Sequence, residues 1–367
     1  MKSMKKICCY LFIVIMMFLV ACGKQNLNKE NTEIKDGQYT EGYGKPIQVK
    51  IDECGGMILF ENGSLYTFGA PNDMPLGRKN KDYHLTKILE DIVDIEIGDD
   101  MAFAVDKKGQ LWGWRAENNS PWKGFELEEM PKVLTKDVKD VAACDSIVII
   151  KNDNSAWIWG SGTEACNSKD GFARILKDVK QVDITSRFGV AIKNDNTMWV
   201  WGDFEWPKEF SDIQEDVPAL YGSGITFATA HQQAISYLDE KGYHNIISFG
   251  EEIVKNNDKK VTRCNYLSSV ENGMYLTQDK KLYVWGKENA YGQFGMGISS
   301  WDGGVDKIEF LDAQIVLEGI IDYDMTGYTA IALDQNGYVY VWGQNMNHIL
   351  GMEDTEAKAI PTVLYRP

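Results

Sequence analysis

Residues 279–297 have the sequence DKKLYVWGKENAYGQFGMG, and this stretch determines how the rest of the chain is interpreted. Its first half, from Leu282 to Trp285, is β-branched and aromatic and stops at Gly286, as a short β-strand does. Its second half contains three further glycines, which can adopt positive φ angles without a Cβ clash. The stretch therefore predicts a short strand followed by a tightly turned loop.

The strand half of this stretch occurs seven times along the chain. The seven copies are LYTFG (65–69), LWGWR (111–115), AWIWG (156–160), MWVWG (198–202), IISFG (246–250), LYVWG (282–286) and VYVWG (339–343). Their ends lie 36 to 57 residues apart. Periods of roughly 40–50 residues with several strands in each unit are typical of β-propellers.

Most of the aromatic strands follow a short apolar strand and a tight turn. The turns at Asn62-Gly63, Asp153-Asn154, Asp195-Asn196 and Asn336-Gly337 have the residues that two-residue hairpins with positive φ prefer. The fifth copy lacks this signature, and we expect a longer loop there, around Gly242.

The combined pattern is a hairpin, then aromatic-x-Trp-Gly, then Asn-x-x-Gly-Gln-Phe-Gly-x-Gly. It resembles the repeat of the regulator of chromosome condensation family. The best copy runs from Trp285 to Gly297, a second begins at Trp342, and a third, which matches only part of the pattern, begins at Phe68. WD-type repeats fit less well, because no copy ends its strand in Trp-Asp.

This resemblance covers about residues 46–367 and implies an all-β fold, a seven-bladed β-propeller in which the glycines and tryptophans are structural. Members of the family serve as nucleotide-exchange factors on small GTPases, as chromatin binders and, in a bacterial relative, as a propeller inhibitor of β-lactamases. The fold by itself does not select among such roles.

The two ends of the repeat array suggest how the ring closes. The first repeat starts at Pro46 with room for inner strands only, while residues 360–364 (IPTVL) repeat the outer-strand pattern of residues 130–134 (MPKVL). We therefore predict that the C-terminal strand pairs into the first blade, which would remove exposed strand edges.

The N-terminus has the pattern of a bacterial lipoprotein signal. Three lysines precede an apolar run from Ile7 to Val20, and Leu19-Val20-Ala21-Cys22 resembles a lipobox. We predict a signal peptide over residues 1–21, a lipid-attachment site at Cys22, a flexible polar tether over 22–45 and the propeller over 46–367. An uncleaved single-span anchor is the alternative, but the run is short for a span.

Both alternatives place the propeller at the extracytoplasmic face of a bacterial cell membrane. The net charge is −16, and it becomes −19 once residues 1–21, with three lysines and no acidic residue, are removed. Such an acidic surface disfavours nucleic acid, whose phosphates need Lys and Arg. It suits a soluble surface outside the cell or a basic protein partner. We expect Cys54, Cys144, Cys166 and Cys264 to be buried or free thiols.

Catalytic and metal-binding patterns are absent from the sequence. The four histidines fall in different repeats, and no H-E-x-x-H, G-x-S-x-G or G-x-x-x-x-G-K-[ST] motif occurs. Asp322-x-Asp324 resembles the start of a calcium loop, but the twelfth position is Leu333 instead of Glu. We predict a protein without catalysis, metal or cofactor.

The remaining functional signal comes from aromatic residues in variable loops. Eight of the eleven tryptophans belong to the repeat strands, whereas Trp122, Trp206 and Trp301 do not. Together with Phe125 and Phe204 they are predicted to cluster on one side of the ring as a binding surface, since Trp and Tyr dominate binding hot spots. The alternative is that each packs beneath its own loop. These residues predict a protein-binding module or, as the alternative, a glycan or cell-wall binder.

Overall fold

A computed structural model describes most of the chain from residue 43 onward. The chain separates into two compact units, 1–36 and 37–367, and the described residues belong to the second. None of the described residues forms a helix long and apolar enough to cross a membrane. The described residues are 43–70, 74–80, 82–98, 100–116, 127–144, 146–160, 171–203, 206, 217–231, 234–248, 251–255, 260–267, 271–299 and 310–367.

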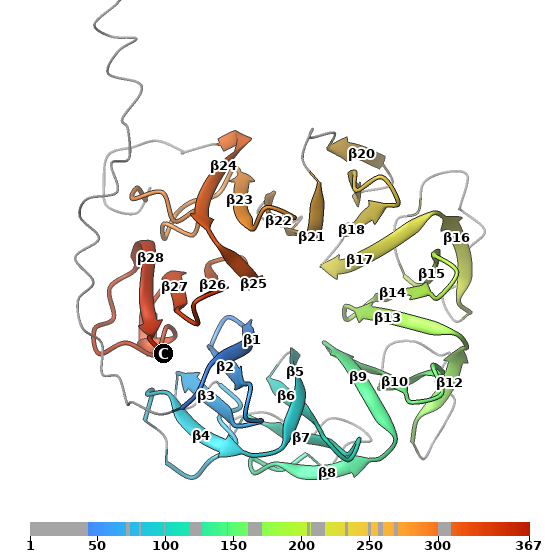
Figure 1. The fold of residues 1–367 in the computed structure, drawn as a ribbon, viewed down its shortest axis with the longest axis horizontal. Helices are drawn as coiled ribbons and strands as arrows, with labels where there is room; N and C mark the ends of the chain where they lie inside the picture. Colours follow the sequence, from blue (N-terminus) through green and yellow to red (C-terminus); the bar gives the residue numbers. More distant parts are fainter. Residues whose placement is uncertain are drawn as a thin grey trace, which may run out of the picture. The chain divides into compact units, whose positions relative to one another are not determined.

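The second unit is a seven-bladed β-propeller, as predicted (Figure 1). Each blade is a four-stranded antiparallel sheet made of four strands that are consecutive in the sequence. The first three blades are β1 (Pro46–Ile51), β2 (Gly55–Phe60), β3 (Leu65–Gly69), β4 (Thr86–Leu89); β5 (Ile92–Gly98), β6 (Met101–Asp106), β7 (Leu111–Arg115), β8 (Lys132–Thr135); and β9 (Val138–Ala143), β10 (Ser146–Lys151), β11 (Ala156–Gly160), β12 (Ala173–Leu176).

The other four blades continue the same order around the ring. They are β13 (Val179–Ile184), β14 (Phe188–Lys193), β15 (Thr197–Gly202), β16 (Ala219–Ser223); β17 (Ile225–His231), β18 (Ala234–Asp239), β19 (His244–Ser248), β20 (Glu251–Lys255); β21 (Val261–Leu267), β22 (Asn272–Thr277), β23 (Lys281–Gly286), β24 (Phe310–Glu318); and β25 (Ile320–Met325), β26 (Thr329–Asp334), β27 (Val339–Gly343), β28 (Lys358–Tyr365).

The predicted mode of ring closure is wrong. The C-terminal strand β28 pairs with β27 in the seventh blade, where Val339 lies opposite Tyr365 and Val341 opposite Thr362. The first blade has its own outer strand, β4, which follows a long loop and lacks the proline that marks residues 130–134 and 360–364. The resemblance of 360–364 to an outer strand was therefore correct, but that strand completes its own blade.

The repeat tryptophans join neighbouring blades, as expected. Trp114 and Trp342 are fully buried. Each donates its indole N–H to a loop carbonyl of the preceding blade, Trp114 to Pro75 at 2.6 Å and Trp342 to Gln293 at 2.9 Å. A large ring needs a small residue beneath it: a Cβ built on Gly189 would lie 2.1 Å from the ring of Trp201.

The loop that follows the third strand is fixed by an asparagine in the two best repeats. Asn289 accepts the amide N–H of Phe294, and Asn345 in the same way accepts that of Leu350. Both apolar residues are fully buried. The asparagine, glycine and aromatic positions of the repeat therefore serve packing and loop geometry.

The propeller has two faces of different construction. On one, which we call the turn face, the hairpin turn between the second and third strands meets the connection between blades: Ile92 N donates to Gly63 O at 2.9 Å, and Val138 N to Gly109 O at 3.0 Å. Blades three, four and six repeat this bond, through Val179, Ile225 and Ile320. The opposite side, the loop face, carries the longer loops.

Candidate functional site: the central channel and the loop face

The first strand of every blade lies nearest the axis of the ring (Figure 1). Side chains at the third and fifth positions of these inner strands line the axis, and nearly all of them are polar. The third-position residues are Gln48, Asp94, Asp140, Gln181, Phe227, Arg263 and Asp322, and the fifth-position residues are Lys50, Glu96, Ala142, Asp183, Thr229, Asn265 and Asp324.

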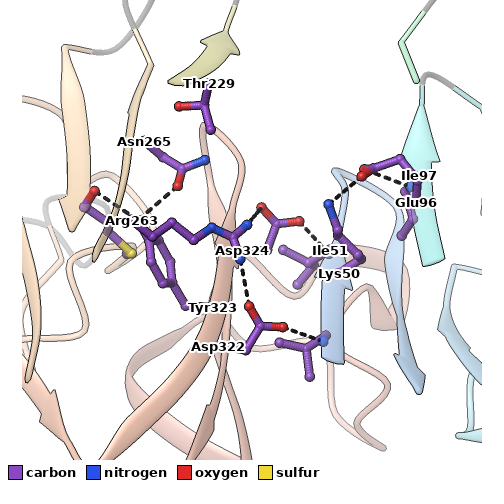
Figure 2. A network of polar contacts seen from close by, with 12 residues as sticks. Lys50, Ile51, Glu96, Ile97, Thr229, Arg263, Asn265, Asp322, Tyr323 and Asp324 are labelled. Atoms are coloured by element: carbon purple, nitrogen blue, oxygen red, sulfur yellow. Dashed lines mark hydrogen bonds and ion pairs between the residues drawn. The ribbon is translucent and has the colours of Figure 1, made fainter. Parts of the chain in front are cut away.

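Two aspartates of the seventh blade bind the first blade (Figure 2). The Oδ2 atom of Asp322 accepts the amide N–H of Val49 at 2.9 Å, and the Oδ2 atom of Asp324 accepts that of Ile51 at 3.1 Å. Arg263 of the sixth blade forms ion pairs with both carboxylates, at 2.6 Å to Asp322 and 3.9 Å to Asp324. This network joins the last two blades to the first.

Further contacts extend the network in both directions. Lys50 forms an ion pair with Glu96 of the second blade at 2.5 Å. Burial alone would lower the pKa of Lys50, but the Glu96 and Asp324 carboxylates raise it above its ordinary value. On the other side, the fully buried Tyr323 donates its hydroxyl to Asn265 Oδ1 at 2.8 Å. Lys50 therefore stays cationic at neutral pH, and its ion pair with Glu96 extends the network to the second blade.

Other joints of the ring use the same type of contact. The amide side chain of Gln181 bonds both the N–H and the C=O of Ala228, and Asp183 accepts the N–H of Ala230 at 2.9 Å. Thr229 donates to the carbonyl of Cys264 at 2.8 Å. An inner strand is an edge strand whose channel-side polar groups have no partner strand. Side chains of the preceding blade satisfy them.

The histidine and cysteine side chains of the described inner strands take part in contacts within the ring. Among the described residues no group of three or more His, Cys, Asp or Glu side chains is placed to hold a metal ion. His231 has a pKa lowered by burial, and its Nε2 atom lies 2.7 Å from the side-chain nitrogen of Asn265. The Cys264 thiol is fully buried, and burial raises its pKa. These groups are bound within the structure.

Asp94 and Asp140 form a pair of carboxyl groups between the second and third blades. Burial raises the pKa of both, that of Asp140 to about 7, with the neighbouring Asp94 charge as the second cause. The Oδ1 atom of Asp94 accepts the Gln48 amide at 3.0 Å. Two buried carboxyls side by side disfavour simultaneous ionisation, so the pair retains a proton near neutral pH.

Of the five predicted binding aromatics, the structure describes only Trp206. Its side chain is half-buried and packs against the apolar cluster of the fourth and fifth blades that includes Phe188 and Ile235. Trp122, Phe125, Phe204 and Trp301 lie outside the described residues, as do Cys22 and Cys166. Their clustering on one surface stays a prediction.

The loop face carries aromatic pairs that the sequence did not single out. Tyr83 stacks on His348 across the joint between the seventh and first blades, with ring centroids 4.0 Å apart. Tyr291 meets Tyr328 edge-on at 5.5 Å across the joint between the sixth and seventh. Tyr328 and the nearby loop residue Met346 are exposed by 36% and 54%. These residues are scattered in the sequence, and only the blade order brings them to one side.

Comparison with known proteins agrees with the repeat pattern. No family model matches the chain. The mouse regulator of chromosome condensation is 20% identical over 339 residues, which cover 83% of this chain and 74% of that protein.

Two solved structures share the fold. Yeast Prp20p from Saccharomyces cerevisiae superposes with a TM-score of 0.66 at 14% identity, covering 84% of this chain and 88% of its own. Human WBSCR16 superposes with a TM-score of 0.64, also at 14% identity, covering 83% and 94%. The chain is a seven-bladed propeller whose repeats are similar to those of the regulator of chromosome condensation.

The Asp94–Asp140 pair predicts a pH-dependent stability. A carboxyl whose pKa is raised in the folded state stabilises the fold fully below its unfolded pKa of about 4, and this contribution is lost as pH rises through about 7. The unfolding free energy should therefore fall between these pH values. Asp140→Asn should flatten that slope, as measured by urea denaturation at several pH values.

The matched control for this experiment is Asp178→Asn, which removes an exposed carboxylate from a blade connection. It should keep the wild-type slope. An Asp140→Asn protein whose pH slope equals that of wild type would show that Asp140 is ionised throughout this range.

Proposed function

We propose that this chain is a lipid-anchored protein-binding module at the extracytoplasmic face of a bacterial membrane, without catalytic activity. The observation that supports the protein-binding role is that the charged side chains of the central channel are already bound within the ring. Arg263, Lys50 and the channel aspartates are bound to one another and to backbone amides. Recognition is then left to the surfaces of a rigid ring. A protein-binding role also agrees with yeast Prp20p, whose structure was described with its binding to Gsp1p and histones.

The loop face is the surface that supports this role best. It presents Tyr328 and Met346 as exposed apolar side chains, and the loop before β28 adds the exposed acidic residues Glu353, Asp354 and Glu356. An apolar patch with a negative rim suits a protein partner that offers apolar and basic contacts. The predicted loop aromatics Trp122, Phe125, Phe204, Trp206 and Trp301 would extend the same side.

The membrane anchor is supported by the lipobox-like sequence before Cys22. Lipid chains contribute about 0.8 kcal/mol per buried CH₂, so two or three acyl chains on this cysteine would hold the protein firmly. A Cys22→Ala variant should remain an unprocessed precursor without acyl groups. Mass spectrometry of the N-terminal peptide and detergent-phase partitioning measure this. A wild-type peptide without acyl mass, together with unchanged partitioning of the variant, would contradict the lipoprotein assignment.

The loop-face assignment predicts a difference between matched variants. After a partner is captured with the mature chain and identified, Tyr328→Ala and Trp206→Ala should each weaken its binding by about 2 kcal/mol. Tyr243→Ala removes a similarly exposed ring, 38%, from the turn face and should leave binding unchanged. Titration calorimetry gives the affinities, and thermal melting checks the fold.

If Trp206→Ala lowers the melting temperature but leaves affinity unchanged, that side chain serves only the packing with Phe188 and its neighbours. If Tyr243→Ala weakens binding as much as Tyr328→Ala does, the partner does not use the loop face.

A further inference from the structure

The turn face surrounds the point at which the chain enters the propeller. The carbonyl of Lys45 accepts the amide N–H of Glu61 at 2.8 Å, which places Lys45 beside the first hairpin turn. If Cys22 is lipidated, 22 residues separate it from Lys45. A flexible tether of this length has an r.m.s. span of roughly 25 Å. The described chain therefore enters the propeller at the turn face.

The second position of each inner strand lies on the turn face, next to the mouth of the channel. In blade order from the seventh, these residues are Ile321, Ile47, Val93, Lys139, Lys180, Thr226 and Thr262. All seven are exposed, and Ile321, Ile47 and Val93 are exposed by 38%, 45% and 47%. Three aliphatic side chains on consecutive blades are thus followed by two lysines. We call these five residues the mouth crescent.

Among the described residues, the two lysines of the mouth crescent bind amide side chains and form no ion pair with a carboxylate. Lys139 donates its ammonium group to the amide oxygen of Asn154, and Lys180 does the same to Asn196. They belong to two equivalent segments, Lys136-Asp137-Val138-Lys139 and Lys177-Asp178-Val179-Lys180, and all four lysines of these segments are exposed.

The turn face also differs in charge from the rest of the molecule. The first 44 residues hold six lysines and four acidic residues, so residues 45–367 have a net charge of −18. In the described turns, blade connections and second positions of the inner strands taken together, however, nine exposed lysines balance nine exposed acidic residues. The net negative charge is therefore carried by the other surfaces, and the turn face is the surface that an anionic bilayer repels least.

We propose that the mouth crescent rests on the surface of an anionic phospholipid bilayer. Lys139 and Lys180 would contact headgroup phosphates, and Ile47, Val93 and Ile321 would enter the interfacial region. This proposal rests on the anchoring part of the proposed function and deepens it. It directs the turn face to the membrane and leaves the loop face open to a partner.

The test uses the mature chain with Cys22→Ser, so that no acyl chain contributes to binding. The probe is a set of vesicles of phosphatidylcholine with a rising fraction of phosphatidylglycerol, and the bound fraction is measured by co-sedimentation. Binding should increase with the anionic lipid and decrease with added salt. The Lys139→Glu/Lys180→Glu variant should bind these vesicles at least about tenfold more weakly than wild type does.

Two control variants make the test specific. Lys87→Glu/Arg174→Glu changes the net charge equally but on the exposed outer strands β4 and β12, and it should bind as wild type does. Val93→Asp should weaken binding, whereas Leu220→Asp, which alters a 52% exposed side chain on β16, should not. Circular dichroism and melting confirm the fold, and Lys139→Gln/Lys180→Gln replaces the Glu pair if that pair fails to fold.

Absence of vesicle binding by wild type, or equal weakening by the crescent and outer-strand pairs, would overturn the proposal. The outcome does not depend on acylation of Cys22, which mass spectrometry of the wild-type chain decides separately. An acylated Cys22 with no vesicle binding by the crescent would leave the anchor in place and reject only the orientation.

Discussion

The hydrogen bonds that the amides of Val49 and Ile51 donate to the Asp322 and Asp324 carboxylates hold the ring closed. At each of the other six joints the chain itself continues from one blade to the next, but the seventh and first blades share no strand. Pro46 also lacks the N–H that Ile92, Val138 and their equivalents donate to the neighbouring turn. Arg263 keeps both carboxylates in place, and Tyr365 adds a hydrogen bond to Gly44 O at 2.9 Å and ring contacts with Tyr43 and Phe60. Removing one partner of such a buried network typically costs about 3–5 kcal/mol.

The need to bind the unpaired backbone groups of the inner strands also explains why the polar side chains of the channel stabilise the ring. A propeller of separate four-stranded blades leaves seven inner edges facing its axis, and their backbone groups need partners. Aspartate, glutamine and threonine side chains from the preceding blade supply several of these partners, while Arg263 and Lys50 balance part of the charge. This arrangement buries several carboxyl groups, including those of Asp140 and Asp183, and burial raises their pKa values. The two faces of the ring, which differ in loop length, are therefore the surfaces left for a partner.

Much of the fold could be predicted from the sequence, because the repeat has a short-range physical basis. Trp285-Gly286, Asn289 and the glycines after it specify a strand end and a loop, whatever surrounds them. Closure could not be predicted in the same way. The strand β4 has the plain sequence Thr-Lys-Ile-Leu, and its assignment depends on pairing with β3 across a long loop. The sequence does not reveal the channel network, because Asp322, Arg263 and Lys50 are far apart in it and Asp322-x-Asp324 by itself resembles the start of a calcium loop. The period-2 alternation of polar residues on each inner strand was the available signal.

Hydrogen exchange at the amides of Val49 and Ile51 tests the closure of the ring most directly. Both amides point away from β2 and would face the channel if the two aspartates did not bind them. The account predicts that they exchange as slowly as the amides paired within the β1–β2 sheet, and that Asp322→Ala and Asp324→Ala each speed exchange at the amide they bind. Fast exchange of Val49 and Ile51 in the wild-type protein, at the rate of exposed loop amides, would contradict it.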